Sequence, residues 1–278
     1  MGIPRNIPLP SARLTGTILA VVLAPLALEA GYLLYLKRSV SRRSVATAGL
    51  RLPAGKLSAS GSDAREPPTN TIPSSVKRPA TMPAEVSDDA SDYALAFERV
   101  VSHPVPASSL KDTLSLPSPA QAGRPTQLMT TYLRTTMKAF TWTPQAFFLR
   151  SAVGPDAKAT FDADFLDALE FEVGDRVDGV YTVSYRGARS GEPEERVEMM
   201  LDPPESYHGP VVQGMIISGI ELLPGDGEEA TQAVFINETW LWRRLEDKPT
   251  LLEGAVGRWL HSLLAQWLVV KGLKAVSR

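Results

Sequence analysis

The stretch Ala233–Arg244 reads AVFINETWLWRR, and its apolar residues recur at every second position. This period is typical of a β-strand, in which successive side chains point to opposite faces. One face holds four apolar side chains and one carboxyl group, from Val234, Ile236, Trp240, Trp242 and Glu238. The other face is more polar. We therefore expect the first face to point into the core and to take Glu238 with it.

The segments that precede this strand have the same period of two. Turn-forming glycine, proline and aspartate residues separate them, which is typical of an antiparallel meander. Together with Ala233–Arg244, they predict a sheet of five strands, the others being Leu169–Val173, Val177–Arg186, Arg196–Leu201 and Val211–Leu222. A further strand is expected near Tyr93–Val101, at the start of the domain.

Other segments have a helical period. Thr126–Phe140 carries apolar residues every three or four positions, a second helix is expected after Pro144, and a short third turn lies near Asp162–Leu169. The tail, Leu251–Val276, has one apolar face that includes Trp259 and Trp267. The sequence thus predicts an α+β domain over 92–278, with a curved antiparallel sheet packed on a long C-terminal helix.

A different pattern precedes this domain. Leu14–Leu36 reads LTGTILAVVLAPLALEAGYLLYL and contains a single charged residue, Glu29. A helix of this length rises about 34 Å, enough to cross a hydrocarbon core of roughly 30 Å. Basic residues bound the stretch on both sides. These features predict a transmembrane helix over 14–36, preceded by an N-terminal flank over 1–13.

The residues after this stretch are basic, rich in serine and proline, and free of aromatic side chains up to Ser91. Such a composition predicts a disordered linker over 37–91. The excess of Lys and Arg after Leu36 predicts a single-pass membrane protein whose C-terminal domain is cytosolic. Because the same region is arginine-rich and poor in acids, a mitochondrial membrane is the alternative.

Charge and composition exclude several classes of function. Residues 1–62 hold eight of the 29 Lys and Arg residues and one of the 31 acids, so the rest of the chain has a net charge of about −9. A nucleic acid is therefore not an expected partner. The chain has no cysteine and three histidines, and it lacks nucleotide-binding motifs. We expect no metal and no cofactor.

The order of the predicted elements resembles the helix-grip fold of START-like proteins and aromatic polyketide cyclases. The resemblance covers residues 92–276 and rests on the order strand, helices, meander and closing helix rather than on a motif. It implies a curved sheet that encloses an apolar cavity for a hydrophobic small molecule. A second resemblance, to the SnoaL-like cone fold, implies a pocket of the same kind. Both groups include catalysts and proteins that only bind.

Two candidate catalytic residues follow from the sequence. Glu238 would be desolvated beside Trp240 and Trp242, which moves a carboxyl group toward acid–base function near neutral pH. The alternative is a structural ion pair of Glu238 with Arg186 or Arg196. His208 lies in the loop Asp202–Pro210, where it would be placed to transfer a proton or simply be solvated. Residues expected to contact a ligand are Trp240, Trp242, Tyr207 and Arg186.

Three hypotheses on function remain open from the sequence. The first is a membrane-tethered accessory protein of specialised metabolism, which would cyclise, lactonise or isomerise a polyketide or terpenoid without a cofactor. The second is a lipid- or sterol-binding module that transfers its ligand unchanged. The third is a structural adaptor. A cavity with an ionisable group would favour the first hypothesis, an apolar cavity the second, and a filled core the third.

Overall fold

A computed structural model describes residues 31–53, 72, 76–87, 92–111, 116, 126–188, 194–224 and 231–278. The chain divides into two compact units, Met1–Arg42 and Arg43–Arg278. In the described part of the first unit, residues 31–41 are helical. The second unit is an α+β domain with an antiparallel sheet and a long C-terminal helix, as the sequence predicted.

The prediction of a transmembrane helix is contradicted. None of the helices in the described ranges is both long and apolar enough to cross a bilayer. The described helical residues at 31–41 include Lys37 and Arg38, and they rise only about 16 Å. Residues 14–30 of the predicted span lie outside the described residues. The single-pass membrane localisation, with a cytosolic domain or in mitochondria, rested on this helix and is corrected with it.

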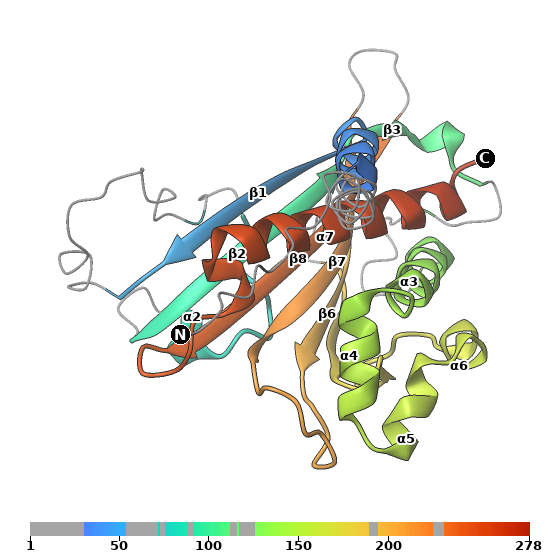
Figure 1. Ribbon diagram of the computed structural model, residues 1–278. Helices are drawn as coiled ribbons and strands as arrows, with labels where there is room; N and C mark the ends of the chain where they lie inside the picture. The colour runs from blue at the N-terminus through green and yellow to red at the C-terminus, as the bar shows by residue number, and fades with distance from the viewer. Residues whose placement is uncertain are drawn as a thin grey trace, which may run out of the picture. The chain divides into compact units, whose positions relative to one another are not determined.

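The strands of the second unit form one antiparallel sheet in the order β1-β2-β8-β7-β6-β5-β4 (Figure 1). The second strand, β2 (Tyr93–Ser102), pairs with the last, β8 (Gln232–Arg244), so strands far apart in the sequence lie side by side. A two-residue strand, β3 (Val105–Pro106), also pairs with β8. The meander between them consists of β5 (Tyr181–Gly187), β6 (Glu194–Leu201) and β7 (Gln213–Leu223).

The sheet differs from the prediction at both edges. Leu169–Val173 is not a strand, and the edge is instead β4 (Arg176–Val177), which turns through Asp178 and Gly179 at positive φ into β5. At the other edge β1 (Ser44–Arg51) pairs with β2, inside the stretch predicted to be a linker. Only two of the β1 residues are buried, Ser44 and Gly49, and neither is a large apolar residue, so the sequence lacks the apolar alternation that marks a strand.

One face of the sheet, here called the helix face, is covered by helices. α7 (Ala255–Val276) lies across β1, β2 and β8 and packs against α3 (Gln127–Phe140) (Figure 1). Gly272 permits this approach, because a Cβ atom there would lie 2.4 Å from the Tyr132 ring. The helix α3 begins at Thr126, whose hydroxyl accepts from the Met129 N–H. The smaller helices of this layer are α4 (Pro144–Ala152), α5 (Pro155–Lys158) and α6 (Ala163–Ala168).

The opposite face is covered by residues 76–87, here called the strap, which end in the short helix α2 (Ala84–Ser87). Two strap side chains, Met82 and Val86, join a buried apolar cluster with sheet residues that include Phe97 and Trp240. The Glu198 carboxylate accepts from the Ala80 N–H at 2.7 Å and the Thr81 N–H at 2.9 Å. We call this side of the sheet the strap face. Both faces are therefore buried.

Candidate functional site

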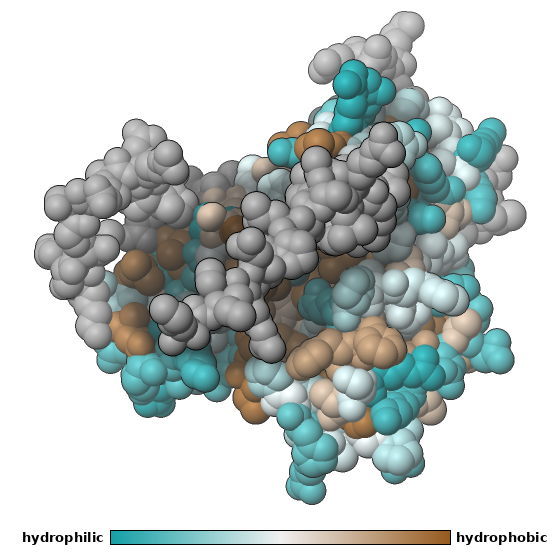
Figure 2. Space-filling view, in the orientation of Figure 1, coloured by the Kyte–Doolittle hydropathy of each residue, from teal (hydrophilic) through white to brown (hydrophobic). Residues whose placement is uncertain are grey.

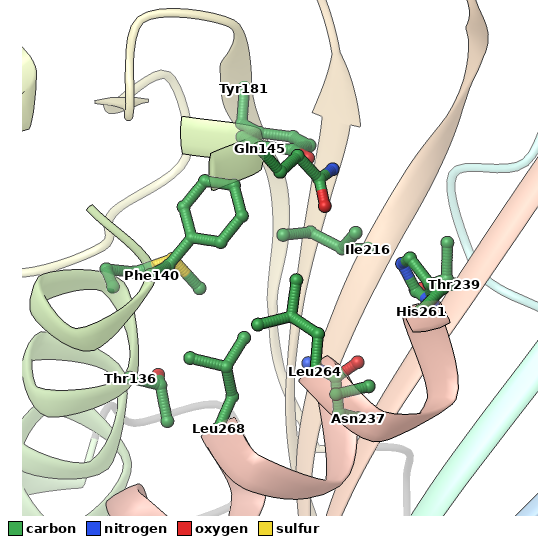
Figure 3. Close-up of a pocket in the computed structure, with 12 residues that line it drawn as sticks. Thr136, Phe140, Gln145, Tyr181, Ile216, Asn237, Thr239, His261, Leu264 and Leu268 are labelled. Atoms are coloured by element: carbon green, nitrogen blue, oxygen red, sulfur yellow. The ribbon is translucent and has the colours of Figure 1, made fainter. Parts of the chain in front are cut away.

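A cavity of about 40 Å³ lies on the helix face, between α3, α4, α7 and the middle of the sheet, and it is partly open (Figure 3). The surface of its walls is mainly apolar, and six polar side chains, including Thr136 from α3, lie among them. The apolar groups include Phe140, Ile216, Leu264 and Leu268, and the polar ones include Gln145, Tyr181, Asn237, Thr239 and His261.

His261 lies at the edge of this cavity, and its imidazole ring contacts a buried carboxylate. Its Nδ1 atom lies 2.9 Å from Oε1 of Glu98, a residue of β2 that is 1 % exposed. An ionised carboxylate at this distance selects the tautomer in which Nδ1 carries the proton. Nε2 then has a free lone pair, and it has no hydrogen-bond partner among the described residues. The pair can therefore act as an oriented base.

Ser262 is the second group on the same carboxylate. Its hydroxyl donates to Oε2 of Glu98, while His261 occupies Oε1. The hydroxyl is thus directed at the carboxylate and not at the imidazole, so these residues do not form a nucleophilic serine triad. Both contacts join α7 to β2 and fix the rotation of the helix over the sheet.

Of the other polar groups of the cavity, the Thr136 hydroxyl donates to the Leu133 carbonyl at 3.0 Å, and four have no partner among the described residues. The side chains of Thr239, Asn237, Gln145 and Tyr181 form no hydrogen bond with any residue that the structure describes. Thr239 is 4 % exposed and lies directly opposite Glu98 in the sheet register. Because all four side chains have unused hydrogen-bonding capacity and Tyr181 and Thr239 are buried, this set is suited to a bound molecule or to water.

The predicted catalytic carboxyl, Glu238, lies on the strap face and does not line the cavity. Its Oε2 atom accepts from Arg196 at 3.0 Å and from the Trp240 indole at 3.2 Å, and Oε1 lies 3.4 Å from Arg99. Burial raises the pKa of Glu238, whereas the charges of Arg196 and Arg99 lower it. This arrangement corresponds to the structural alternative, an ion pair with Arg196.

The residues predicted to contact a ligand are also in other places. Trp240 is fully buried against Phe97, with ring centroids 4.4 Å apart, and Trp242 belongs to the same cluster. Arg186 is on the helix face, where it pairs with Glu195 at 3.0 Å beside the first turn of α3. These side chains are held by the protein itself.

His208 and Tyr207 lie in the loop between β6 and β7. The His208 side chain is exposed, and the backbone N–H of this residue donates to the Ala152 carbonyl at 2.8 Å. The Tyr207 hydroxyl donates to the Pro210 carbonyl at 3.2 Å. Neither residue lines the cavity, and the structure does not bring His208 to Glu238.

The sequence did contain a signal for the Glu98–His261 pair. In β2, Glu98 alternates with the apolar residues Ala94, Ala96 and Val100 on one face of the strand. A charged group in such a row needs a partner from the element that covers it. The covering element is α7, which contains one histidine, His261.

Exposed aromatic side chains gather on and next to α4. Trp142, Phe147 and Phe148 are 88 %, 76 % and 53 % exposed. Figure 2 shows apolar surface in the region where Figure 1 places α4. The adaptor hypothesis would use a surface of this kind.

Comparison of the chain with protein-family models, curated proteins and solved structures finds no match. The resemblance to START-like proteins and polyketide cyclases, and the one to the SnoaL-like cone, stay predictions.

Proposed function

We propose that the protein binds a small, mainly apolar molecule in the cavity and catalyses a proton transfer on it without a cofactor. The observation that supports this most is the contact of Glu98 with Nδ1 of His261 at the edge of an apolar cavity. A general base needs a nitrogen lone pair that faces the substrate and a group that holds the ring in place. His261 and Glu98 supply these two parts.

The reaction that fits these groups best is isomerisation next to a carbonyl. Nε2 of His261 would take a proton from the carbon beside the carbonyl and return it to another atom of the same molecule, so that no atom is gained or lost. Thr239 and Asn237 would donate hydrogen bonds to the negative oxygen that forms in between. Cyclisation or lactonisation of a polyketide or terpenoid would use the same proton transfer.

The size of the cavity favours a small substrate over the lipid- or sterol-carrier alternative. Pockets that enclose a drug-sized ligand measure roughly 300–1,000 Å³, and this cavity measures about 40 Å³. A longer polyketide or terpenoid would place only its reacting end inside.

Deuterium exchange tests the proposal without knowledge of the natural substrate. Full-length protein is incubated in D₂O with short linear ketones, and the loss of the protons beside the carbonyl is followed by NMR. We expect exchange above the buffer rate, and a decrease of about 10²–10⁴-fold in His261→Gln. Glutamine at this position can still donate to Glu98, so the fold should be kept.

The other two histidines of the chain provide matched controls. His103→Gln and His208→Gln should exchange as fast as the wild type, because both side chains are exposed and outside the cavity. Glu98→Gln should be slower than the wild type, because its amide no longer fixes the tautomer of His261. Exchange at the buffer rate with every ketone, or an equal loss in His208→Gln, would refute the proposal.

A further inference from the structure

The end of the cavity that lies away from His261 has its own pair of polar groups. Tyr181 is the first residue of β5, and Gln145 is in the first turn of α4. β6 and β7 separate β5 from β8, so the backbones that carry Tyr181 and Thr239 are about 14 Å apart across the sheet. Figure 3 shows Tyr181 and Gln145 on one side of Ile216 and Leu264, and His261 and Thr239 on another.

The Tyr181 hydroxyl is available to a molecule in the cavity. The residue is only 5 % exposed, its hydroxyl has no partner among the described residues, and it lines the cavity. A hydroxyl that has no partner in the protein can donate to an acceptor that enters the cavity. Burial raises the pKa of Tyr181, so the group stays a hydrogen-bond donor over the physiological range. The Gln145 amide beside it can both donate and accept.

The charges around the cavity restrict what can bind. None of its described lining residues is Lys, Arg, Asp or Glu. A carboxylate or phosphate would therefore lose its hydration without gaining a cationic partner. An uncharged oxygen, such as a carbonyl or hydroxyl, loses much less and can be satisfied by Tyr181 and Gln145.

We propose that Tyr181 and Gln145 form a second hydrogen-bonding subsite, which binds an uncharged oxygen of the substrate at the end of the cavity away from His261. The inference rests on the proposed function and defines its substrate class. The substrate is neutral and has two oxygen functions, separated by a short apolar segment that lies along Ile216 and Leu264. One oxygen is at the reacting carbon, and the other sets the position of the molecule.

A titration with three sets of linear probes tests this inference. The probes are diketones of six, seven and eight carbons with a carbonyl group near each end, the monoketones of equal length, and the matching keto acids. Binding to the full-length protein is followed through the methyl NMR signals of Ile216, Leu264 and Leu268. We expect one diketone to bind roughly three- to tenfold more tightly than its monoketone, from the added hydrogen bonds. The keto acid should bind more weakly than that diketone.

Two variants assign the difference to the subsite. Tyr181→Phe and Gln145→Met should each bring the diketone advantage toward unity. Tyr185→Phe, in the same strand but outside the cavity lining, should keep it in full. An undiminished advantage in Tyr181→Phe and Gln145→Met, equal affinities in the wild type, or tightest binding of the keto acid would each overturn the inference and leave the role of His261 standing. Absence of any shift at the cavity methyl groups would overturn the inference and the proposed function together.

Discussion

The buried pair Arg186–Glu195 allows a strict test of how this domain is held together, because the sequence analysis assigned Arg186 to a ligand. Both side chains are 3 % exposed, and Arg186 donates to one carboxylate oxygen from Nε at 3.1 Å and from Nη2 at 3.0 Å. The same carboxylate accepts from the Thr126 backbone N–H and hydroxyl, where α3 begins. The perturbation is Glu195→Gln, which keeps the shape and removes the charge.

The expected magnitude follows from what is left behind. Arg186 cannot lose its proton, so Glu195→Gln leaves a buried cation with only neutral acceptors, among them the Thr130 hydroxyl at 2.9 Å. Removal of one partner of a buried pair costs about 3–5 kcal/mol. For a domain of this size, 1 kcal/mol shifts the melting temperature by about 2–4 °C. We therefore expect a decrease of roughly 6–20 °C.

The assay is a double-mutant cycle in thermal and urea unfolding. Arg186→Met and the double variant Arg186→Met/Glu195→Gln complete the cycle. Because the double variant has no unpaired buried charge, it should be more stable than the sum of the single changes predicts, with a coupling of at least about 1 kcal/mol. Glu205→Gln, at an exposed acid, is the control and should unfold as the wild type does.

Two results would contradict a mainly structural role of the Arg186–Glu195 pair. If Glu195→Gln unfolds within about 2 °C of the wild type, the pair does not carry the stability that its burial implies. If Arg186→Met is stable but no longer shows methyl shifts with the diketones, then Arg186 contacts the ligand as the sequence suggested, and its pairing with Glu195 is secondary.

Four further substitutions have defined outcomes. Asp178 is buried and its carboxyl group has no hydrogen-bond partner among the described residues, so burial raises the pKa of this group. The contribution of Asp178 to stability is therefore present below its pKa in the unfolded chain and is lost as the pH rises through its pKa in the folded domain. Asp178→Asn should therefore melt higher than the wild type at pH 8, with a smaller difference at pH 5. Glu238→Gln should lower the melting temperature at neutral pH, because it leaves the buried guanidinium group of Arg196 without its carboxylate partner; an equal or higher melting temperature would show that burial of the Glu238 charge outweighs this pair. Glu198→Gln should weaken the strap by about 1–3 kcal/mol, measured as faster tryptic cleavage after Lys77 or Arg78. Gly272→Ala should destabilise by about 1–3 kcal/mol in urea unfolding, because the added methyl group meets the Tyr132 ring; an unchanged midpoint would mean that the two helices move apart at no cost.

The elements with a strong and regular period were predicted closely. Tyr93–Val101 became β2, Thr126–Phe140 became α3 with Thr126 as its N-cap, and the last long strand of the prediction became β8. In these segments local preference and tertiary packing agree, so pattern alone identifies the element. The helix predicted over 251–276 begins at Ala255, after a short turn at Leu251–Glu253.

The orientation of the closing helix was predicted less well. Trp259 was expected on the apolar face, but it is 37 % exposed, and Trp267 is half-buried with the Lys271 ammonium 5.5 Å from its ring centroid. α7 packs against the sheet on one side and α3 on another, so its buried residues extend around most of its circumference. A helix buried in this way has no single apolar stripe from which its rotation can be read.

The location of the site could not be predicted from alternation, because alternation identifies the more apolar face of a strand and not the element that covers it. In β8 the more apolar face carries Glu238, and the strap buries it together with Trp240. The strap comes from a stretch whose composition resembles a linker, so two covered faces could not be expected from pattern alone. The core was therefore expected on one side of β8 only, and the more polar side was treated as surface.

The polar character of that second side is what makes it chemically useful. On the strap face the Glu238 carboxylate pairs with Arg196 and Arg99, so both of its oxygens already have cationic partners in the protein. On the helix face Glu98 contacts His261, a residue that can itself give up or take a proton. Thr239, which lies opposite Glu98 in the sheet, has no hydrogen-bond partner among the described residues. A carboxylate paired with arginine stays fixed because arginine does not titrate, whereas one paired with histidine can assist a reaction. In this sheet, the residue that pairs with a buried acid therefore decides, more than the degree of burial does, whether the acid is suited to a structural or to a chemical role.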